Sequence, residues 1–479
     1  LSLVWEIRAA NQQNRLGTAP NPWKGQRGFF STDSQRFFAG WDTGSYSIDH
    51  YLKSDLTPLR ARSRALVRKN ENGKRVIRLF KSNIVGPVGV LVQAQSKSLR
   101  NGKWDLDRPA NEAIEEAFRD WCEDPVNCDH THQSSFVDLQ NIAIANTVQD
   151  GELLFRKHYG RSAGKYGFRL EAIDPELLDT EKNEPLLKNG GEIRLGVEYD
   201  KNKRPVRYWF KERSFDGTYH VGRTYSISAS HIIHGFVPEW PDQSRGIPWF
   251  HASIEKTKHL EKYEESAIVA SRAKAGSMGF LTSKGADEYK GEQDAPEYGD
   301  GVTVDQFDAG TIKDIGDREF HSHDPTYPHQ MYDPFVKSTL RRIAAGVGVS
   351  YHALSMDMSD VNYSSIRAGV LEDREIFKGI QNWFIRQFIR KVYQEWLGMA
   401  YMMGAIKVGR SPLSRPVEQY LPANFQPRRW AWVDPQKDGA ANQLAVELRT
   451  KSRSQIIREE GNDPETVFAE IQREEEMLT

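Results

Sequence analysis

Apolar residues recur at helical spacing in the first part of the chain. Helices are expected at 57–84, in two pieces separated at Asn72-Gly73, at 109–122 and at 134–149. Gly86-Pro87 ends the first of these regions, and the apolar run at 88–94 is typical of a strand.

Strand-like patterning prevails between residues 151 and 234. Strands are expected at 153–159, 168–173, 193–199, 206–210 and 232–234. The first two flank a glycine-rich turn, and residues 200–203 read as a hairpin loop. We therefore expect an α+β fold in which the sheet is mostly antiparallel.

Helical spacing returns at residue 253. Leu260, Tyr263, Ala267 and Ala270 follow one another at intervals of three and four, which predicts a helix of roughly 22 residues, about 33 Å long, ended by glycines at 276 and 279. The small residues of this seam favour close packing against a neighbouring helix, and a second helix is expected at 332–345. Residues 281–328 between them have few apolar anchors and predict a small, weakly cored excursion.

A polar loop separates the second helix from the longest one. The loop consists of Ser355, Met356, Asp357, Met358, Ser359, Asp360, Val361 and Asn362. Asn362 or Ser364 is a suitable N-cap for a helix at 364–397, which would be about 50 Å long. The tail at 438–475 reads as a pair of short polar helices split at 461–464.

Charge is balanced overall but uneven along the chain. The 479 residues include 65 Lys and Arg and 66 Asp and Glu, which argues against a uniformly basic protein that coats nucleic acid. Residues 53–81 nevertheless carry a net charge of +8, and residues 436–479 carry −4. The length allows two to four domains.

Cysteine content and hydropathy restrict the protein class. Two cysteines do not make a disulfide scaffold and fit folding in a reducing cytoplasm. Apolar runs stay well below the ~18 residues of a transmembrane helix, so we expect a soluble protein without a membrane partner. The first residues lack a signal-peptide pattern and an initiator Met, which fits a numbering that begins inside a longer product.

Sequence motifs for catalysis are weak. Residues 160–166 resemble a phosphate-binding loop, but three residues separate the glycines instead of four and Tyr166 replaces the hydroxyl residue that would bind Mg²⁺. A hairpin turn is the favoured interpretation. No nucleophile elbow or HExxH motif is present, so we expect no enzyme, no catalytic residue and no cofactor.

Two clusters contain zinc-ligand residue types. The first is Cys122, Cys128, His130 and His132, and the second is His321, His323, Asp324 and His329. The spacing of the first departs from the usual zinc patterns, and the second lies in a Pro-containing linker without an identifiable supporting partner. We favour polar loops over zinc sites for both clusters, and metal analysis of the purified protein decides between the two interpretations.

Basic residues form two candidate nucleic-acid surfaces. Arg60, Arg64 and Arg68 share one helix face, either as a phosphate track or, as we favour, as a solvated or inter-subunit ion-pair face. A second set consists of Lys337, Arg341 and Arg342, with Arg272 and Lys274 at the end of the preceding helix. This set would bind DNA weakly in a monomer, but repeated around a ring it would form a positive band.

Several separated motifs occur in an order that resembles one known family. They are LRARSRALVRKN at 59–70, NIVG at 83–86, DGELLF at 150–155, IIH at 232–234, QSRGIP at 243–248, IAAGVGVSYHALS at 343–355, NYSSIRA at 362–368 and WVDPQKD at 432–438. Together they are similar to the lambda-type portal proteins of tailed bacteriophages, over about 55–475. Residues 70–73 depart slightly from the family pattern, and 281–328 match no motif.

The resemblance implies an assembly and its partners. Portal proteins of this type form a ring, a dodecamer in the mature head, at one capsid vertex of the virion. A terminase pumps double-stranded DNA through the central channel, where it is retained and later ejected. The implied partners are the terminase large subunit, the major capsid protein and scaffold, and head–tail connector or adaptor proteins. The chain itself would be made in the host cytoplasm.

The resemblance also implies a portal-type division of the subunit. A mixed wing domain would occupy 1–250. Two stem helices, at 251–278 and 329–346, would flank a small α/β clip at 279–328. The segment 347–435 would hold the tunnel loop, the long wing helix and the returning wing segment, and a helical crown would follow at 436–479.

The implied DNA-facing residues are the second basic set and the polar loop. Lys337, Arg341, Arg342, Arg272 and Lys274 would face the channel, and residues 355–362 would be the tunnel loop, a soft surface that lets DNA slide. The alternatives are a nucleic-acid enzyme of the packaging machinery, which an ATPase or nuclease assay would reveal, and a head–tail adaptor that does not contact DNA, which would be shorter and lack the long helix.

Overall fold

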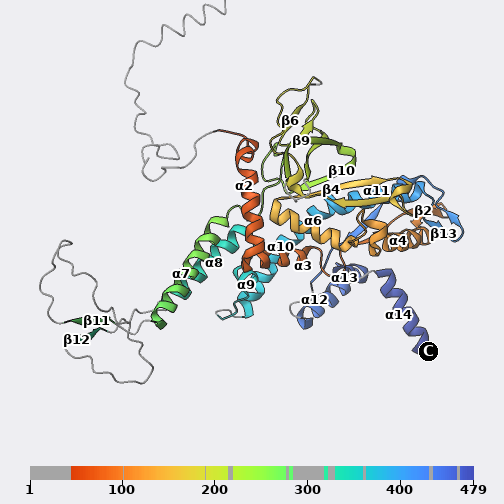
Figure 1. Cartoon of the computed structure of the whole chain (residues 1–479). Coiled ribbons are helices and arrows are strands. Elements are labelled where there is room, and N and C mark those ends of the chain that lie inside the picture. Colours follow the sequence, from red (N-terminus) through yellow and green to blue (C-terminus); the bar gives the residue numbers. More distant parts are fainter. Residues whose placement is uncertain are drawn as a thin grey trace, which may run out of the picture. The chain divides into compact units, whose positions relative to one another are not determined.

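The computed structural model separates residues Leu1–Ser47 from the unit Ile48–Thr479, and the fold described here belongs to the second unit (Figure 1). The structure describes residues 45–100, 102–188, 190–213, 219–276, 280–283, 318–321, 330–359, 363–430, 435–460 and 464–478. The chain mixes helices with several small antiparallel sheets, as expected.

The basic region forms two helices, α2 (Ile48–Lys69) and α3 (Glu71–Ile84), and the predicted break is displaced. Asn70 has extended backbone angles, and its side chain accepts a hydrogen bond from the Gly73 N–H at 3.1 Å, so it caps α3. Gly73 lies inside the helix because α2 passes close by: a Cβ there would lie 2.9 Å from the Leu66 carbonyl oxygen. The break predicted at Asn72-Gly73 is therefore wrong by two residues.

The next part alternates short strands and helices. Its elements are β1 (Leu91–Ala94), β2 (Lys97–Arg100), β3 (Lys103–Leu106), α4 (Arg108–Glu123), α5 (Pro125–Cys128) and α6 (Phe136–Asp150). Both predicted helices are confirmed, and the strand predicted at 88–94 is confirmed only at 91–94, because the chain is still in the turn after α3 at residue 88. β1 pairs with β15 (Ala423–Gln426), more than 300 residues further along the chain, and β2 pairs with β3.

Two antiparallel sheets follow. The first has the order β10-β4-β5 and contains β4 (Glu152–Tyr159), β5 (Phe168–Ala172) and β10 (Ile232–Phe236). The second has the order β6-β7-β8-β9 and contains β6 (Glu192–Arg194), β7 (Val197–Tyr199), β8 (Pro205–Arg213) and β9 (Tyr219–Ser228). The hairpin loop predicted at 200–203 joins β7 to β8, as expected.

The single strand predicted at 193–199 is wrong. Leu195 and Gly196 both have positive φ angles, 49° and 84°, and form a turn between β6 and β7. The chain turns close to another segment, since a Cβ on Gly196 would lie 2.5 Å from the Asp179 carbonyl oxygen. This contact could not be read from the alternation of side chains.

The long helix is continuous with a π-helical turn inside it. It runs through α10 (Tyr363–Phe384), the π segment Ile385–Ile389 and α11 (Arg390–Met402). Ser364 lies within the helix and does not cap it, and Asn362 lies outside the described residues. The core contains large aromatic side chains from α4, α6, β4 and this helix: Phe118, Trp121, Phe136, Phe155, Phe388, Tyr393 and Trp396.

The remaining elements complete the chain. The helix pair predicted after residue 253 is confirmed as α7 (Ile254–Gly276) and α8 (Tyr332–Val347), and the strands β11 (Phe280–Ser283) and β12 (Arg318–His321) pair with each other. α9 (Tyr351–Ser355) follows α8, and β13 (Lys407–Val408) pairs with β14 (Ser411–Pro412).

The C-terminal part contains three helices instead of the predicted two. They are α12 (Pro435–Glu447), α13 (Arg453–Glu460) and α14 (Pro464–Leu478). Sequence patterning found the break at 461–464 but missed the one between α12 and α13. Arg449, with a positive φ of 56°, interrupts the helix there.

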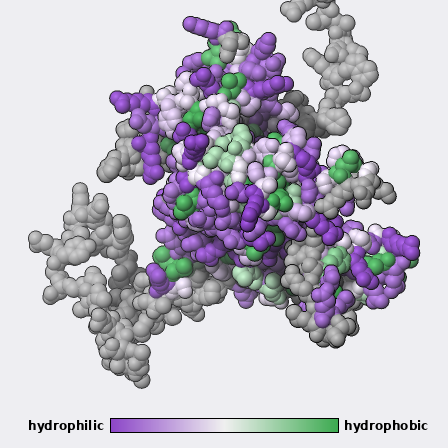
Figure 2. Space-filling view, turned by 90° about the vertical axis from the view of Figure 1, so that its right-hand side faces the viewer, coloured by the Kyte–Doolittle hydropathy of each residue, from purple (hydrophilic) through white to green (hydrophobic). Residues whose placement is uncertain are grey.

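Hydrophilic residues predominate on the face of the molecule shown in Figure 2, where hydrophobic residues form small scattered groups. In the described part of the chain, no helix combines the length and hydropathy needed to cross a bilayer.

Candidate functional site

Helices α7 and α8 pack side by side and carry the second basic set (Figure 1). The Tyr263 ring of α7 lies 4.6 Å from the Phe335 ring of α8, measured between centroids. Leu260 and Ala267 are buried, as the predicted seam requires. Ala270 is exposed, so the part of the seam that packs within one subunit ends at Ala267.

The five predicted channel residues differ in their surroundings. Arg341 and Arg342 are exposed on α8, and Arg272 is exposed near the end of α7. Lys337 is partly buried because it contacts neighbouring groups. Lys274 belongs to the last turn of α7, and its side chain lies outside the described residues.

The chain between α8 and α10 is held by local hydrogen bonds. Gly348, with φ of 79°, ends α8 in the left-handed conformation. Ser350 caps α9, and its hydroxyl donates to Asp373 of α10 at 2.6 Å, which ties the short helix to the long one. Met356, with φ of 59°, ends α9 and turns the chain into the predicted tunnel loop.

Asp357 organises the described part of that loop. Its carboxylate accepts hydrogen bonds from the Tyr351 hydroxyl at 2.8 Å and from the Ser359 hydroxyl and N–H at 2.6 and 2.9 Å. These bonds, chiefly those from Ser359, lower the pKa of the Asp357 carboxyl. The carboxylate is therefore charged at neutral pH.

Lys337 joins the loop to α8. Its Nζ lies 3.7 Å from Asp357 Oδ2, 3.4 Å from Ser359 Oγ and 3.2 Å from Asp333 Oδ2. The Arg341 guanidinium lies 5.2 Å from the centre of the Tyr351 ring, on which it forms a cation–π contact. Of the five predicted basic residues, Lys337 thus contacts the described part of the loop, and Arg341 contacts α9, which leads into it.

The rest of the predicted loop is only partly described. Met356 and Met358 are exposed, and Asp360, Val361 and Asn362 lie outside the described residues. Sequence reasoning did not foresee that Tyr351 and Asp357 would bind α8. The signal was the i, i+4 spacing of Asp333, Lys337 and Arg341, which puts them on one helix face.

Replacing Asp357 by Asn is expected to loosen the tunnel loop. The neutral amide loses the charged contact with Lys337 and weakens the bonds from Ser359 and Tyr351, so amide hydrogen exchange at 356–359 should accelerate about five- to tenfold, as for one ordinary hydrogen bond lost. Asp333→Asn is the control, because it removes the other carboxylate near Lys337 and leaves the loop bonds intact. Equal exchange in both variants would contradict the role of Asp357.

A buried ionic cluster joins four of the sequence motifs. Glu152 of β4 lies 2.7 Å from both Arg60 of α2 and Arg245, and 3.0 Å from His234 of β10. All four side chains are almost fully buried. Burial alone would raise the pKa of the Glu152 carboxyl, but Arg245, Arg60 and His234 hold it well below its ordinary value.

This cluster corrects the interpretation of the first basic set. Arg60 is buried, and Arg64 binds Asp150 at 2.7 Å and also Asp174. Arg60 is therefore not part of a phosphate track or a solvated face, Arg64 is partly buried and engaged by carboxylates of its own chain, and Arg68 is exposed. The one-sided spacing of these arginines reflects a helix face that packs inward onto carboxylates.

The first candidate zinc cluster does not assemble. The Cys128 thiol donates to the Ser134 carbonyl at 3.4 Å, and His130 stacks on His158 with ring centres 3.9 Å apart. Burial raises the pKa of Cys122 well above its ordinary value and that of Cys128 to about 12, so both are thiols at neutral pH. Within the described ranges, no three His, Cys, Asp or Glu side chains gather as a metal site would require.

The second cluster cannot be placed. His323, Asp324 and His329 lie outside the described residues, and only the backbone of His321, in β12, is described. The zinc interpretation of this cluster stays a prediction for metal analysis.

The glycine-rich segment 160–166 is a hairpin turn, as favoured. It joins β4 to β5, and the Gly160 N–H donates to the Gly167 carbonyl at 3.0 Å. Lys165 pairs with Asp120 at 2.9 Å on the surface. The lysine therefore engages a carboxylate within the chain.

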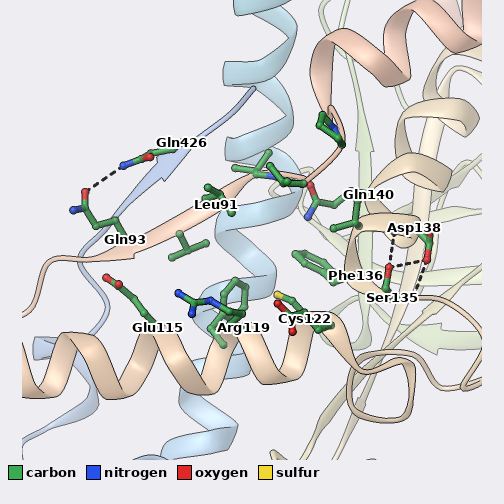
Figure 3. A pocket seen from close by; sticks show the side chains of 17 residues that line it. Leu91, Gln93, Glu115, Arg119, Cys122, Ser135, Phe136, Asp138, Gln140 and Gln426 are labelled. Carbon is green, nitrogen blue, oxygen red and sulfur yellow. Dashed lines mark hydrogen bonds between the residues drawn. The ribbon is translucent and has the colours of Figure 1, made fainter. Parts of the chain in front are cut away.

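A pocket of about 540 Å³ lies between β1, α4 and the start of α6 (Figure 3). Its polar groups maintain the fold: Glu115 accepts from the Ala94 N–H at 2.7 Å, and Gln140 accepts from the Val90 N–H at 3.0 Å. Ser135 and Asp138 form the capping box of α6. These hydrogen bonds explain the polar side chains of the pocket as parts that stabilise the fold.

Comparison with known proteins gives consistent matches. The family described as phage portal protein, lambda family, matches residues 34–381. The probable portal protein of Halomonas phage phiHAP-1 is 32% identical over 429 residues, covering 88% of this chain and 81% of that protein. Portal protein B of Escherichia phage lambda is 23% identical over 480 residues, covering 91% and 86%. A solved structure titled as the neck of a native gene transfer agent particle shares 14% identity and a TM-score of 0.43, covering 86% of this chain and 94% of that one.

The chain belongs to the lambda family of phage portal proteins. The resemblance inferred from the ordered motifs is thereby confirmed. Proteins of this family are structural, so the expectation that the chain is not an enzyme is confirmed as well.

Proposed function

We propose that this chain is the subunit of a portal ring, dodecameric in the mature head, at one vertex of a phage capsid. Its channel carries double-stranded DNA inward during packaging, retains it and releases it at ejection. The family assignment is the observation that carries this function. The contact of Lys337 with Asp357, which joins α8 to the proposed tunnel loop, is compatible with it.

The parts of the subunit take the following roles in this proposal. Residues 1–250 form the wing, 251–278 and 329–346 the stem, 279–328 the clip, 347–435 the tunnel loop, long wing helix and returning wing segment, and 436–479 the crown. The packing of α7 against α8 supports their assignment to one stem. Most of the clip lies outside the described residues.

The chemistry around the tunnel loop suits DNA that must slide. Arg341 and Arg342 offer exposed positive charge to phosphates, while Lys337 is already partly neutralised by Asp357 and Asp333. Because affinity rises steeply with each phosphate neutralised, a small number of free cations per subunit attracts DNA without trapping it. Exposed Met356 and Met358 add a soft surface beside them.

The proposed partners follow from this role. The clip would meet the terminase large subunit during packaging and connector or adaptor proteins afterwards. The wing would contact the major capsid protein and scaffold. The protein would be made in the host cytoplasm and reside at the portal vertex of the virion.

Electron microscopy of the purified protein tests the proposed ring. Negative-stain images are expected to show closed rings with a central hole, and mass photometry should give a single large species with a mass that is a multiple of the subunit mass. Particles that stay monomeric or dimeric at every concentration and salt condition would overturn the proposal.

A further inference from the structure

A groove between α2 and α7 combines an apolar floor with a basic rim. Its volume is about 540 Å³. Ala65, Leu66 and Ile254 form the floor, and the charged residues around it are Arg62, Lys69, Lys258, Lys262, Glu255 and Glu261. With four cations against two carboxylates, the rim is net positive. We call this feature the basic groove.

One face of α10 has the opposite character. Val370, Leu371 and Ile376 are 37%, 45% and 40% exposed, and Glu372 and Glu375 are exposed beside them. The i, i+4 pairs Leu371/Glu375 and Glu372/Ile376 put these four side chains on one side of the helix. Two cations lie near them in the sequence: Lys378 pairs with Glu375 at 2.5 Å, and Arg374 lies over the Trp430 ring, 5.8 Å from its centre. We call Leu371, Glu372, Glu375 and Ile376 the acidic ridge.

Helix α3 stands between the two features within one chain. It approaches α2 where Gly73 meets Leu66, and it packs on α10 where the Phe80 and Phe377 rings lie 5.7 Å apart. The buried Phe377 belongs to the side of α10 that faces α3, so the ridge lies on a different side of the helix. The ridge therefore needs a second molecule to reach a groove.

We propose that the acidic ridge of one subunit docks in the basic groove of the next copy of this chain. This inference rests on the proposed ring. Exposed Leu371 and Ile376 offer an apolar surface that covers the apolar floor of the groove, and the carboxylates of the ridge face the basic rim. A contact between two different patches is heterologous, which is the kind of interface that closes a ring.

Charge reversal on each side tests the pairing. The groove variant is Arg62→Glu with Lys262→Glu, and the ridge variant is Glu372→Lys with Glu375→Lys. Each variant alone places like charges across the contact, so the protein concentration needed for half of the subunits to enter rings should rise about tenfold or more, measured by mass photometry.

Complementation is the sharper part of this experiment. In an equimolar mixture, each acidic ridge meets an intact basic groove and each basic ridge meets a reversed acidic groove, so rings should return with alternating subunits. The chain that carries all four substitutions should also form rings on its own. Matched controls are Lys201→Glu with Arg204→Glu and Glu112→Lys with Glu116→Lys, which reverse exposed charges elsewhere.

The outcomes separate this inference from the proposed function. If the wild-type chain forms no rings, the proposed function fails. If wild-type rings form and both reversed variants assemble like the controls, only the docking inference fails. Reversed variants that fold with unchanged circular dichroism melts, fail to assemble and are not restored by mixing or combination would also overturn the ridge–groove pairing.

Discussion

Replacing Glu152 by Gln is expected to lower the free energy of unfolding by about 3–5 kcal/mol, the range found when a buried ion pair loses one partner. The substitution leaves Arg60 and Arg245 buried without the carboxylate that both contact at 2.7 Å. Since Arg60 comes from α2 and Arg245 from the turn after β10, the loss should separate these segments from β4. Urea denaturation at pH 7 measures the effect, and Glu116→Gln on exposed α4 is the matched control.

The same variant should change how stability depends on pH. The folded-state pKa of Glu152 is depressed, so its stabilisation is present above the unfolded-state value of about 4.3 and is lost as pH falls through the folded value. The wild-type chain should therefore lose more stability than Glu152→Gln when pH is lowered from about 4.3 towards the acid limit. Parallel pH profiles for the two proteins would contradict the assigned role of this carboxylate.

If the proposed channel assignment holds, reversing Lys337, Arg341 and Arg342 to Glu is expected to reduce packaged DNA by about tenfold or more, because each subunit would then repel the DNA phosphates instead of attracting them. Because every subunit carries the same three substitutions, the repulsion is repeated around the proposed ring. Nuclease-protected DNA per particle gives the measurement. Lys201→Glu, Arg204→Glu and Arg207→Glu reverse three exposed charges in and beside the β7–β8 loop and provide the matched control.

A double variant distinguishes the effect of lost positive charge on α8 from the effect of a disrupted tunnel loop. Lys337→Glu also breaks the contact with Asp357, whereas Arg341→Glu with Arg342→Glu retains it. The double variant should still form rings and should still package poorly. Normal packaging by rings that carry all three substitutions would contradict the assignment of α8 to the channel surface.

Local patterns predicted the elements whose stabilising contacts lie near in sequence. Helix α6 and the β4–β5 hairpin follow from periodicity and turn residues, as Ser135 with its capping box and the Gly160 turn illustrate. The pairing of β1 with β15 joins Leu91 to Gln426, and no local signal marks it. The turn at Gly196 likewise depends on the passing Asp179 backbone.

The sequence predicted which residues belong to the candidate site, but not which of them contact one another. The basic residues of α8 and the polar loop were both found from the sequence, yet the bond between Tyr351 and Asp357 depends on how α9 folds back. The arginine face of α2 shows the converse case. Arg60 has the spacing of a surface residue, and its burial depends on Glu152, 92 positions later in the chain.

The π segment Ile385–Ile389 accommodates one extra residue within the long helix. A π turn holds about one more residue than an α turn for nearly the same rotation around the axis. Deleting a single residue there would therefore restore regular α winding and keep Trp396 and its neighbours nearly in register with α4. A deletion within α11 itself, before Trp396, would instead turn the residues after it by about 100°. One-residue deletions should thus be better tolerated at 385–389 than in the regular α-helical turns that follow.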